Sequence, residues 1–566
     1  MRTLYKFHGG VHPPEHKEES NRLPIAPAPL PKRLTVPLRQ HIGNPAIPVV
    51  QVGDHVLKGQ IIGAADGFIS AAVHAPTSGT VSAIEPHAVP HPSGLPDLCI
   101  TIEADGEERW IERAPLDYRN VDPDAVRHRL RDAGVVGLGG AVFPSHVKLN
   151  PGAPAGIKTL VLNGAECEPW ITSDDRLMRE RAAEVVEGIR IMAHLMHPKE
   201  VLIGIEDNKP EAAAAMRSAC QGTGYEVVVV PTLYPSGGEK QLIKLLTGKE
   251  VPAGQRPVNI GVTCSNTGTA YTVHRAVNHG EPVISRIVTV TGNVPEPRNF
   301  EALIGTPIAE IIQLAGGARP DTDRYIMGGP MMGFGLDNLT APLTKAVNCV
   351  IATSPALFLP APPPMPCIRC GRCAQACPCE LQPQELFWFS HSQNFDKARA
   401  YNLFDCIECG ACGYVCPSHI PLVSYYRFAK SEIAVRDMEK KLAEQAKERF
   451  ELKQQRLERE KQEKAARFAE KAAAAAAAKA AAAGSGVENP EAAAKKAAIQ
   501  AAVERAKAKK AEAAAKAEGA ATPADEIPQE DSDPLRANPT LPSGSHRTRA
   551  RAESYAPSTE NNTDSR

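Results

Sequence analysis

Two stretches of this chain repeat one another and determine how its central part folds. Cys367–Pro378 reads CIRCGRCAQACP, and Cys406–Pro417 reads CIECGACGYVCP. Each cysteine of the second stretch lies 39 residues after its counterpart in the first. Gly371 and Gly410 occupy the same place in the two runs. A glycine there permits the tight turn that three closely spaced thiolates need to surround one face of a metal cluster.

The spacing of these cysteines, with a proline after the fourth, is the one that binds [4Fe–4S] clusters in two-cluster ferredoxins. In such pairs the fourth cysteine of each run ligates the other cluster. One predicted ligand set is Cys367, Cys370, Cys373 and Cys416, and the other is Cys406, Cys409, Cys412 and Cys377. Structural zinc also uses cysteine pairs, but it needs neither a third close cysteine nor a second copy of the run. We interpret Cys379 as a spare thiol rather than a ligand.

Composition limits the remaining possibilities. A length of 566 residues predicts several domains. The net charge of −1 gives no global field that would attract nucleic acid or a membrane surface. Met1–Leu4 leads into polar sequence, so no secretory signal peptide is expected. No apolar run approaches the roughly 20 residues of a membrane-spanning helix. Scattered cysteines outside the two runs indicate a reducing compartment rather than a disulfide framework; they are Cys99, Cys167, Cys220, Cys264, Cys349 and Cys379.

The first hundred residues contain short β-type runs separated by glycine and proline. Pro48–Gln60 is followed by His74–Val81, and the pair resembles the barrel-sandwich hybrid fold of biotinyl and lipoyl carriers. In those carriers a lysine lies on the hairpin between the two halves. The corresponding stretch here, Ala64–Ser70, has no lysine. The resemblance therefore implies the fold and argues against a swinging-arm role.

From about Val126 the pattern becomes that of an α/β domain. Apolar runs such as Thr159–Leu162 and Val227–Val230 predict buried strands, and Arg181–Met196 predicts a helix. Short buried strands between helices favour a parallel sheet covered by helices. Gly134–Pro144 is dense in glycine, which lets backbone N–H groups approach a phosphate. The run does not match the spacing of the dinucleotide-binding fingerprint.

Polar loops follow in an order that carries a second resemblance. Asn163–Pro169 comes directly after a strand, where α/β sheets bind ligands, and Gly237–Lys240 and Cys264–Thr269 come later. This order resembles the flavin- and NADH-binding subunit of respiratory complex I. The resemblance implies that FMN is surrounded by Gly137, Gly139, Gly140, Lys148, Asn163, Glu166, Glu239 and Asn266, with Glu168 nearer the nicotinamide. Val142 and Leu138 depart from the family, which has glycine and arginine there.

The segments on either side of the cysteine runs complete the pattern. Arg286–Val294 and Gly328–Gly333 resemble the soluble ligand-binding β-grasp module of the same family. Pro360–Pro366 predicts a stiff, extended linker to the clusters. Ser431–Lys471 predicts a charged helix that continues into alanine and lysine, and from about Thr522 the sequence is typical of disorder.

The predicted fold class is multidomain α/β plus β. The expected parts are a barrel-sandwich hybrid domain (1–115), a complex I-like FMN/NADH-binding α/β domain (120–275), a β-grasp module (280–345), a two-cluster ferredoxin-like domain (358–430) and an Ala/Lys/Glu-rich helical, then disordered, tail (431–566). This order resembles the C subunits of the Rnf (Rsx) ion-translocating electron transport complexes.

The resemblance implies a peripheral subunit on the cytoplasmic side of the bacterial inner membrane. Such a subunit passes electrons between NAD(H), FMN and two [4Fe–4S] clusters to membrane subunits of the same complex. It implies an electron-transfer partner such as ferredoxin, no nucleic acid, and membrane contact through partners. No catalytic side chain is assigned. Two alternatives stay open: a flavin-free subunit that transfers electrons through clusters alone, and a redox partner that keeps a sensor protein reduced.

Overall fold

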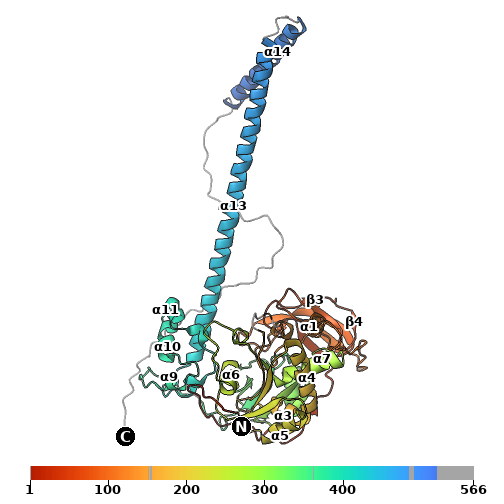
Figure 1. Cartoon of the computed structure of the whole chain (residues 1–566), viewed down its shortest axis with the longest axis vertical. Coiled ribbons are helices and arrows are strands. Elements are labelled where there is room, and N and C mark those ends of the chain that lie inside the picture. The colour runs from red at the N-terminus through yellow and green to blue at the C-terminus, as the bar shows by residue number, and fades with distance from the viewer. Residues whose placement is uncertain (1, 151, 153–155, 361, 484–489, 519–566) are drawn as a thin grey trace, which may run out of the picture. The chain divides into compact units, whose positions relative to one another are not determined.

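The computed structural model describes residues 2–150, 152, 156–360, 362–483 and 490–518. Contacts divide the chain into two units, Met1–Lys447 and Glu448–Arg566. The first unit holds all of the β-sheets of the described residues, together with both cysteine runs (Figure 1).

The barrel-sandwich part consists of short antiparallel strands in two small sheets, as expected. One sheet has the order β2-β8-β7-β4 and the other the order β3-β5-β6. Val36, Ile62 and Ile100 are fully buried between them. In carrier domains the lysine lies on the hairpin between the two halves. Here the corresponding stretch contains Phe68, which is largely exposed. The strands are β2 (Arg33–Pro37), β3 (Ile47–Pro48), β4 (His55–Val56), β5 (Ile61–Ala64), β6 (Val73–His74), β7 (Gly79–Ala88) and β8 (Pro96–Ala104).

The α/β part is built on a parallel sheet of order β11-β10-β9-β12. Leu160, Leu162 and Ile203 are fully buried, as expected of strands covered by helices on both faces. The predicted helix over Arg181–Met196 is confirmed as α4 (Ala182–Met196). The other elements are α1 (Pro123–Asp132), α2 (Ser145–Lys148), β9 (Thr159–Gly164), α3 (Ser173–Glu180), β10 (Glu200–Glu206), α5 (Pro210–Ala219), β11 (Glu226–Val230), α6 (Glu239–Thr247), η1 (Pro257–Ile260), β12 (Val262–Asn266) and α7 (Thr267–Asn278).

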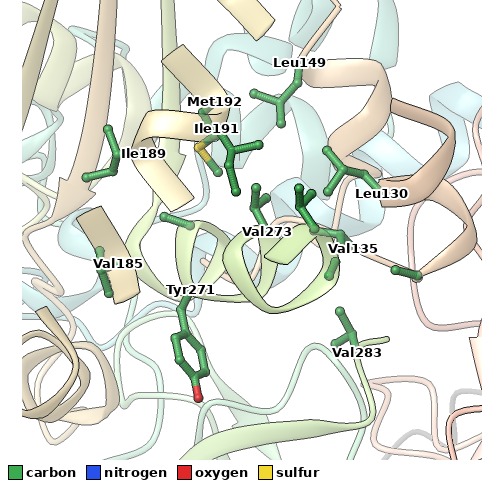
Figure 2. Close-up of a cluster of buried hydrophobic side chains, with 14 of the residues drawn as sticks. Leu130, Val135, Leu149, Val185, Ile189, Ile191, Met192, Tyr271, Val273 and Val283 are labelled. Carbon is green, nitrogen blue, oxygen red and sulfur yellow. The ribbon is translucent and has the colours of Figure 1, made fainter. Parts of the chain in front are cut away.

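A large apolar core fixes the helices of this part. Figure 2 shows Val185, Ile189 and Met192 of α4 gathered around Val273 of α7, which is fully buried. Leu130 of α1 reaches the same cluster. Because interiors are close-packed, this core holds the loops at the strand ends in a fixed arrangement.

The β-grasp part is a mixed sheet of order β1-β14-β13-β17-β15-β16, with α8 (Ile308–Leu314) packed against it. Two of its strands come from beyond residues 280–345. Strand β1 (Ala26–Pro27) pairs in parallel with β14 (Arg298–Leu303), and β17 (Cys349–Thr353) pairs with β13 (Ser285–Gly292). The remaining strands are β15 (Arg324–Met327) and β16 (Phe334–Gly335).

Residues 2–25 contain neither a helix nor a strand, and we call this segment the N-terminal strap. It runs along the α/β part instead of joining the barrel-sandwich sheets. Val11 pairs with Tyr234, and the backbone N–H of Tyr5 donates to the carbonyl of Leu245. The strap also touches the cysteine region, where the N–H of Gly10 donates to the carbonyl of Ala376.

The cysteine runs fold into short helices around a small core that includes Leu386 and Tyr426. This region contacts the α/β part directly, because Val11 of the strap and Tyr234 pack against Ala376 and Cys409. The helices are α9 (Arg372–Ala376), α10 (Pro383–His391), α11 (Phe395–Ala400), η2 (Leu403–Asp405) and α12 (Ala411–Tyr414).

The predicted charged helix is α13 (Leu422–Ala483), whose first turns are buried as far as Ile433. Most of its later residues are exposed. It is followed by α14 (Pro490–Glu518). The stretch from about Thr522, for which the sequence predicts disorder, lies outside the described residues. Within the described ranges, no helix has both the length and the apolar character that crossing a membrane requires.

Candidate functional site

The first predicted ligand set lies around a single cavity. Cys367, Cys370, Cys373 and Cys416 all line a space of about 500 Å³. Three of these cysteines come from the first run and the fourth from the second. The spacing predicts such a grouping, in which each run supplies the fourth ligand of the other cluster.

The second predicted ligand set borders a narrower cavity of about 20 Å³. Its walls include Cys377 from the first run and Cys406, Cys409 and Cys412 from the second. Cys379 lines the same cavity. Apart from the sulfur atoms, the lining is mainly apolar, and it includes Leu386 and Tyr426.

The two runs adopt the same backbone conformation, which explains the repeated glycine. Gly371 has φ of +75° and begins α9, and Gly410 has φ of +80° and begins α12. The residue two positions earlier is also left-handed in both runs, at Arg369 and Glu408. A side chain at either glycine would strain the turn, so the expected tight turning of the runs is confirmed.

The donors of both sets are cysteine sulfurs, the ligands that [4Fe–4S] clusters use. In the described part of the chain, no three histidine, cysteine or acidic side chains converge closely enough to hold one metal ion. Burial raises the pKa of Cys409 to about 12 and raises the pKa of Cys412 still further. Ligation requires both groups as thiolates.

The second cavity lies against the α/β and β-grasp parts. The hydroxyl of Tyr234 donates to the carbonyl of Cys409 at 2.6 Å. Gly410 lies so close to Met331 that a Cβ there would come within 2.5 Å of the Met331 carbonyl oxygen. Glycine is therefore required at 410 both for its left-handed turn and for this contact.

The glycine-rich loop lies near the carboxyl end of β12. A Cβ on Gly139 would come within 3.2 Å of the Cβ of Asn266, whereas nothing lies within 4 Å of the Cβ position of Gly140. Gly140 has φ of +111°. Gly137 closes the loop by donating its N–H to the carbonyl of Phe143. The backbone is thus bare enough to approach a flavin or nucleotide phosphate, as the glycines predict.

The two departures from the complex I pattern have different consequences. Leu138 is buried, and its N–H bonds to Thr269, so it serves packing. Val142 adopts φ of +42°, a left-handed conformation that is rare for a β-branched residue. Strain of this kind costs on the order of 1–3 kcal/mol, and a glycine at 142 would avoid it.

The remaining polar candidates gather at the carboxyl edge of the parallel sheet. Lys148 and Glu239 form an ion pair at 2.7 Å, and both are about two-thirds buried. Burial opposes protonation of Lys148, but the charge of Glu239, the nearby Cys264 and the hydrogen bond to Glu239 together outweigh it and raise the pKa of Lys148. The side-chain amide of Asn163 donates to the carbonyl of Gly237. The Lys148 ammonium has the charge that a phosphate would require.

Glu166 caps a helix. Its carboxylate accepts from the backbone N–H groups of Asp174 and Asp175, at the start of α3. Desolvation raises the pKa of Glu166 to about 8, opposed by the nearby Lys17. Asn266 donates to the carboxylate of Asp174 at 2.5 Å, so Glu166 and Asn266 meet the same helix end.

Glu168 joins the α/β part to the β-grasp part. Its carboxylate accepts from the backbone N–H groups of Met331 and Met332, at 2.7 and 2.9 Å. Burial raises the pKa of Glu168, against the effect of these bonds. Glu168 therefore belongs to the same contact region as Gly410 and the second cavity.

Lys17 is a residue of this site that the sequence does not reveal. Its ammonium is fully buried and donates to the carbonyls of Glu166, Glu168 and Ile171, at 2.7, 3.0 and 2.7 Å. The neighbouring His16 stacks on Trp170 with ring centroids 4.2 Å apart. Lys17 lies in a polar stretch that resembles ordinary surface sequence, so no local signal could have revealed this role.

Four family models match the chain, in the order of its parts. They are the RnfC barrel sandwich hybrid domain (residues 5–107), the Nuo51 FMN-binding domain (130–275), the SLBB domain (287–335) and the 4Fe-4S dicluster domain (366–420). These matches confirm the predicted fold class. They also support FMN and [4Fe–4S] clusters as the cofactors.

Curated relatives, each named as the C subunit of an ion-translocating oxidoreductase complex, match over 81% of the chain. The protein from Pseudomonas aeruginosa is 55% identical and that from Serratia proteamaculans 52% identical, and the chain spans 60% and 65% of their lengths. A relative from Yersinia pestis bv. Antiqua is 52% identical, and 74% of its length is covered.

Solved structures give a weaker likeness. A chain of an NAD+-reducing [NiFe]-hydrogenase in the air-oxidized state matches with a TM-score of 0.40 and 18% identity, over 51% of this chain and 60% of that one. Its H2-reduced state gives a TM-score of 0.41, over 57% and 63%. On the strength of the curated relatives and the ordered set of domain matches, the chain belongs to the family of ion-translocating oxidoreductase complex C subunits (RnfC).

Proposed function

We propose that this chain is a peripheral subunit of a membrane-bound ion-translocating oxidoreductase. It passes electrons between NAD(H), FMN and two [4Fe–4S] clusters, and on to membrane subunits of the same complex. The observation that carries the proposal is the contact of the second cysteine cavity with the α/β part through Tyr234 and with the β-grasp part through Gly410. Electron transfer needs such close approach, and an isolated ferredoxin-like domain would not provide it.

The proposed ligands are the two crossed sets of cysteines, Cys367, Cys370, Cys373 and Cys416, and Cys406, Cys409, Cys412 and Cys377. We propose that FMN is held by Gly137, Gly139, Gly140, Lys148, Asn163, Glu166, Glu239 and Asn266, and that Glu168 lies on the nicotinamide side. For the domains we propose the bounds 1–115, 120–275, 280–345, 358–430 and 431–566.

The chain's own residues bind and orient the flavin. When bound, FMN supplies the exchange between a two-electron nicotinamide and one-electron clusters. Lys148 offers a positive charge to the phosphate, and the glycine loop offers backbone N–H groups. Two contacts fix the Glu166–Glu168 loop. Lys17 donates to the carbonyl of Glu166, and the carboxylate of Glu168 accepts from the N–H of Met331. Tyr234 keeps its proton, since burial raises its pKa, and so remains a donor to Cys409.

The positions of the two cavities support an order of transfer. The second cavity borders the α/β part. The first cavity is lined by Cys370 and Ile368, which are exposed. The cluster of the second run would therefore exchange electrons with the flavin. The cluster of the first run would exchange them with the external partner.

A partner such as ferredoxin and a place on the cytoplasmic side of the inner membrane are parts of the same proposal. They rest on the family membership and on the reducing compartment that the free cysteines indicate. Membrane contact would come through partner subunits. High salt or a chaotrope should then release the chain from membranes, and carbonate-resistant binding of the chain expressed alone would contradict this.

The test is reduction by NADH. Anaerobically purified protein is mixed with NADH, and the iron–sulfur absorbance and the EPR spectrum are followed. The proposal expects both clusters to be reduced at a rate that depends on bound flavin. If protein that contains clusters but no flavin is reduced equally fast, the flavin-free alternative holds. If NADH reduces neither cluster in protein that contains flavin, the NADH-linked function is wrong.

A further inference from the structure

The second cysteine cavity has one more thiol than a [4Fe–4S] cluster needs. Four cysteines around it are the proposed ligands, and Cys379 is a fifth residue of its wall. Only Pro378 separates Cys379 from the proposed ligand Cys377. Two thiols therefore reach the same cavity from one short stretch of chain.

The repeat shows that this position faces a cavity in both runs. The residue two positions after the fourth cysteine is Cys379 in the first run and Ser418 in the second. Ser418 lines the first cavity as Cys379 lines the second. The hydroxyl of Ser418 donates to the carbonyl of Pro366. The geometry is therefore shared, but only the second cavity has a sulfur at this position.

Cys379 is partly buried, and it also borders a second space. Its sulfur accepts a long contact of 3.8 Å from the side-chain amide of Gln241. On its other side it lines a separate open pocket of about 280 Å³, together with Lys240 and Lys244 of α6. The Cys379 side chain therefore borders both spaces.

We propose that Cys379 is a reserve ligand of the cluster held by the second run. When Cys377 is lost, the Cys379 thiol gives its proton to solvent and its sulfur bonds the iron that Cys377 served. The count of four thiolates is thereby restored with no change in the oxidation state of the cluster. The proposal rests on the proposed cluster ligation.

The test compares alanine variants by iron and sulfide content after anaerobic purification. The wild type is expected to hold about eight irons. Cys377→Ala and Cys379→Ala should each keep about eight, whereas the double variant should keep about four. Cys416→Ala should fall to about four by itself, because Ser418 supplies no sulfur.

A gain of function completes the comparison. Cys416→Ala combined with Ser418→Cys should recover about eight irons. Iodoacetamide labelling gives an independent readout: Cys379 should be labelled in the wild type and protected in Cys377→Ala. The EPR spectrum of one cluster should change in Cys377→Ala, since a new ligand alters its surroundings.

Failure of the reserve role is distinguishable from failure of the cluster assignment. A wild type without about eight irons would contradict the ligand sets themselves. With a normal wild type, loss of the cluster in Cys377→Ala to the level of the double variant would overturn the reserve role. If Cys377→Ala fails to fold, the Ser418→Cys rescue decides: no recovery there shows that this position does not reach the iron.

Discussion

Single side chains hold the proposed flavin loop in a conformation that its own sequence does not favour. Glu166 and Trp170 both have positive φ, at +48° and +71°, although neither is glycine. Residues in such conformations persist only where their surroundings enforce them. Lys17 provides that enforcement through its three bonds to the loop.

Replacing Lys17 by methionine should therefore loosen this loop. The variant keeps the apolar stem but leaves three carbonyls without their donor, at a cost of roughly 2–3 kcal/mol. We expect a lower thermal midpoint and reduced flavin content, with the iron content maintained. Lys6→Met is the matched control, because Lys6 is an exposed lysine of the same strap. Equal flavin content in the two variants would exclude this positioning role.

Glu166 should make stability depend on pH. Desolvation raises its pKa from 4.5 to about 8. Between these values the folded protein holds a proton that the unfolded chain has released, so stability falls as pH rises through this window. Glu166→Gln has no such proton and should flatten the fall in thermal midpoint measured from about pH 5 to about pH 8. Glu18→Gln, at an exposed site of the strap, should keep the wild-type slope. An unchanged slope in Glu166→Gln would show that another group causes it.

At the scale of elements, the carboxyl ends of β9 and β12 bring the glycine loop, Lys148 and Asn266 to one edge of the sheet. Much of this could be predicted, because glycines, apolar strands and strand-end polar residues are local signals. The cysteine runs were predictable for the same reason. The sequence does not assign strands β1 and β17 to the β-grasp sheet, since their partners lie far away in sequence or beyond the recognised pattern.

A substitution in the glycine loop, compared with one at a similar glycine elsewhere, distinguishes backbone strain from loss of flavin binding. Gly140→Val should abolish flavin binding and NADH-linked reduction of an artificial acceptor, because the side chain enters the open space beside the loop. The cluster spectrum should survive. Gly222→Val is the control: Gly222 is also left-handed, with φ of +75° and nothing within 4 Å, but it follows α5. If both variants bind flavin equally, the loop does not hold the flavin.

At the scale of the molecule, segments that are distant in sequence complete the proposed site. The strap comes from the first 25 residues, the flavin loops from the α/β part, and the second cavity from residues beyond 370. The sequence identified each part but not how they meet. Lys17 and Tyr234 carry these contacts, and neither lies in a recognisable motif.

The chain beyond Lys447 should be dispensable for the clusters. The buried turns of α13 end at Ile433, and contacts assign Glu448–Arg566 to a separate unit. A chain that ends at Lys447 should therefore keep its iron and flavin content, as measured by chemical analysis. A chain that ends at Pro421 should lose its clusters, because it lacks Leu422 and Tyr426 of the cluster core. Loss of iron in the longer variant would contradict this division.

The central claim is that two crossed sets of cysteines hold two clusters beside one flavin. Its most direct measurement is the content of iron, acid-labile sulfide and FMN in anaerobically purified protein, with Cys416→Ser as the companion variant. The account predicts about eight irons, about eight sulfides and one FMN per chain, and loss of about four irons in the variant. One or two metals per chain, or zinc in place of iron, would contradict it.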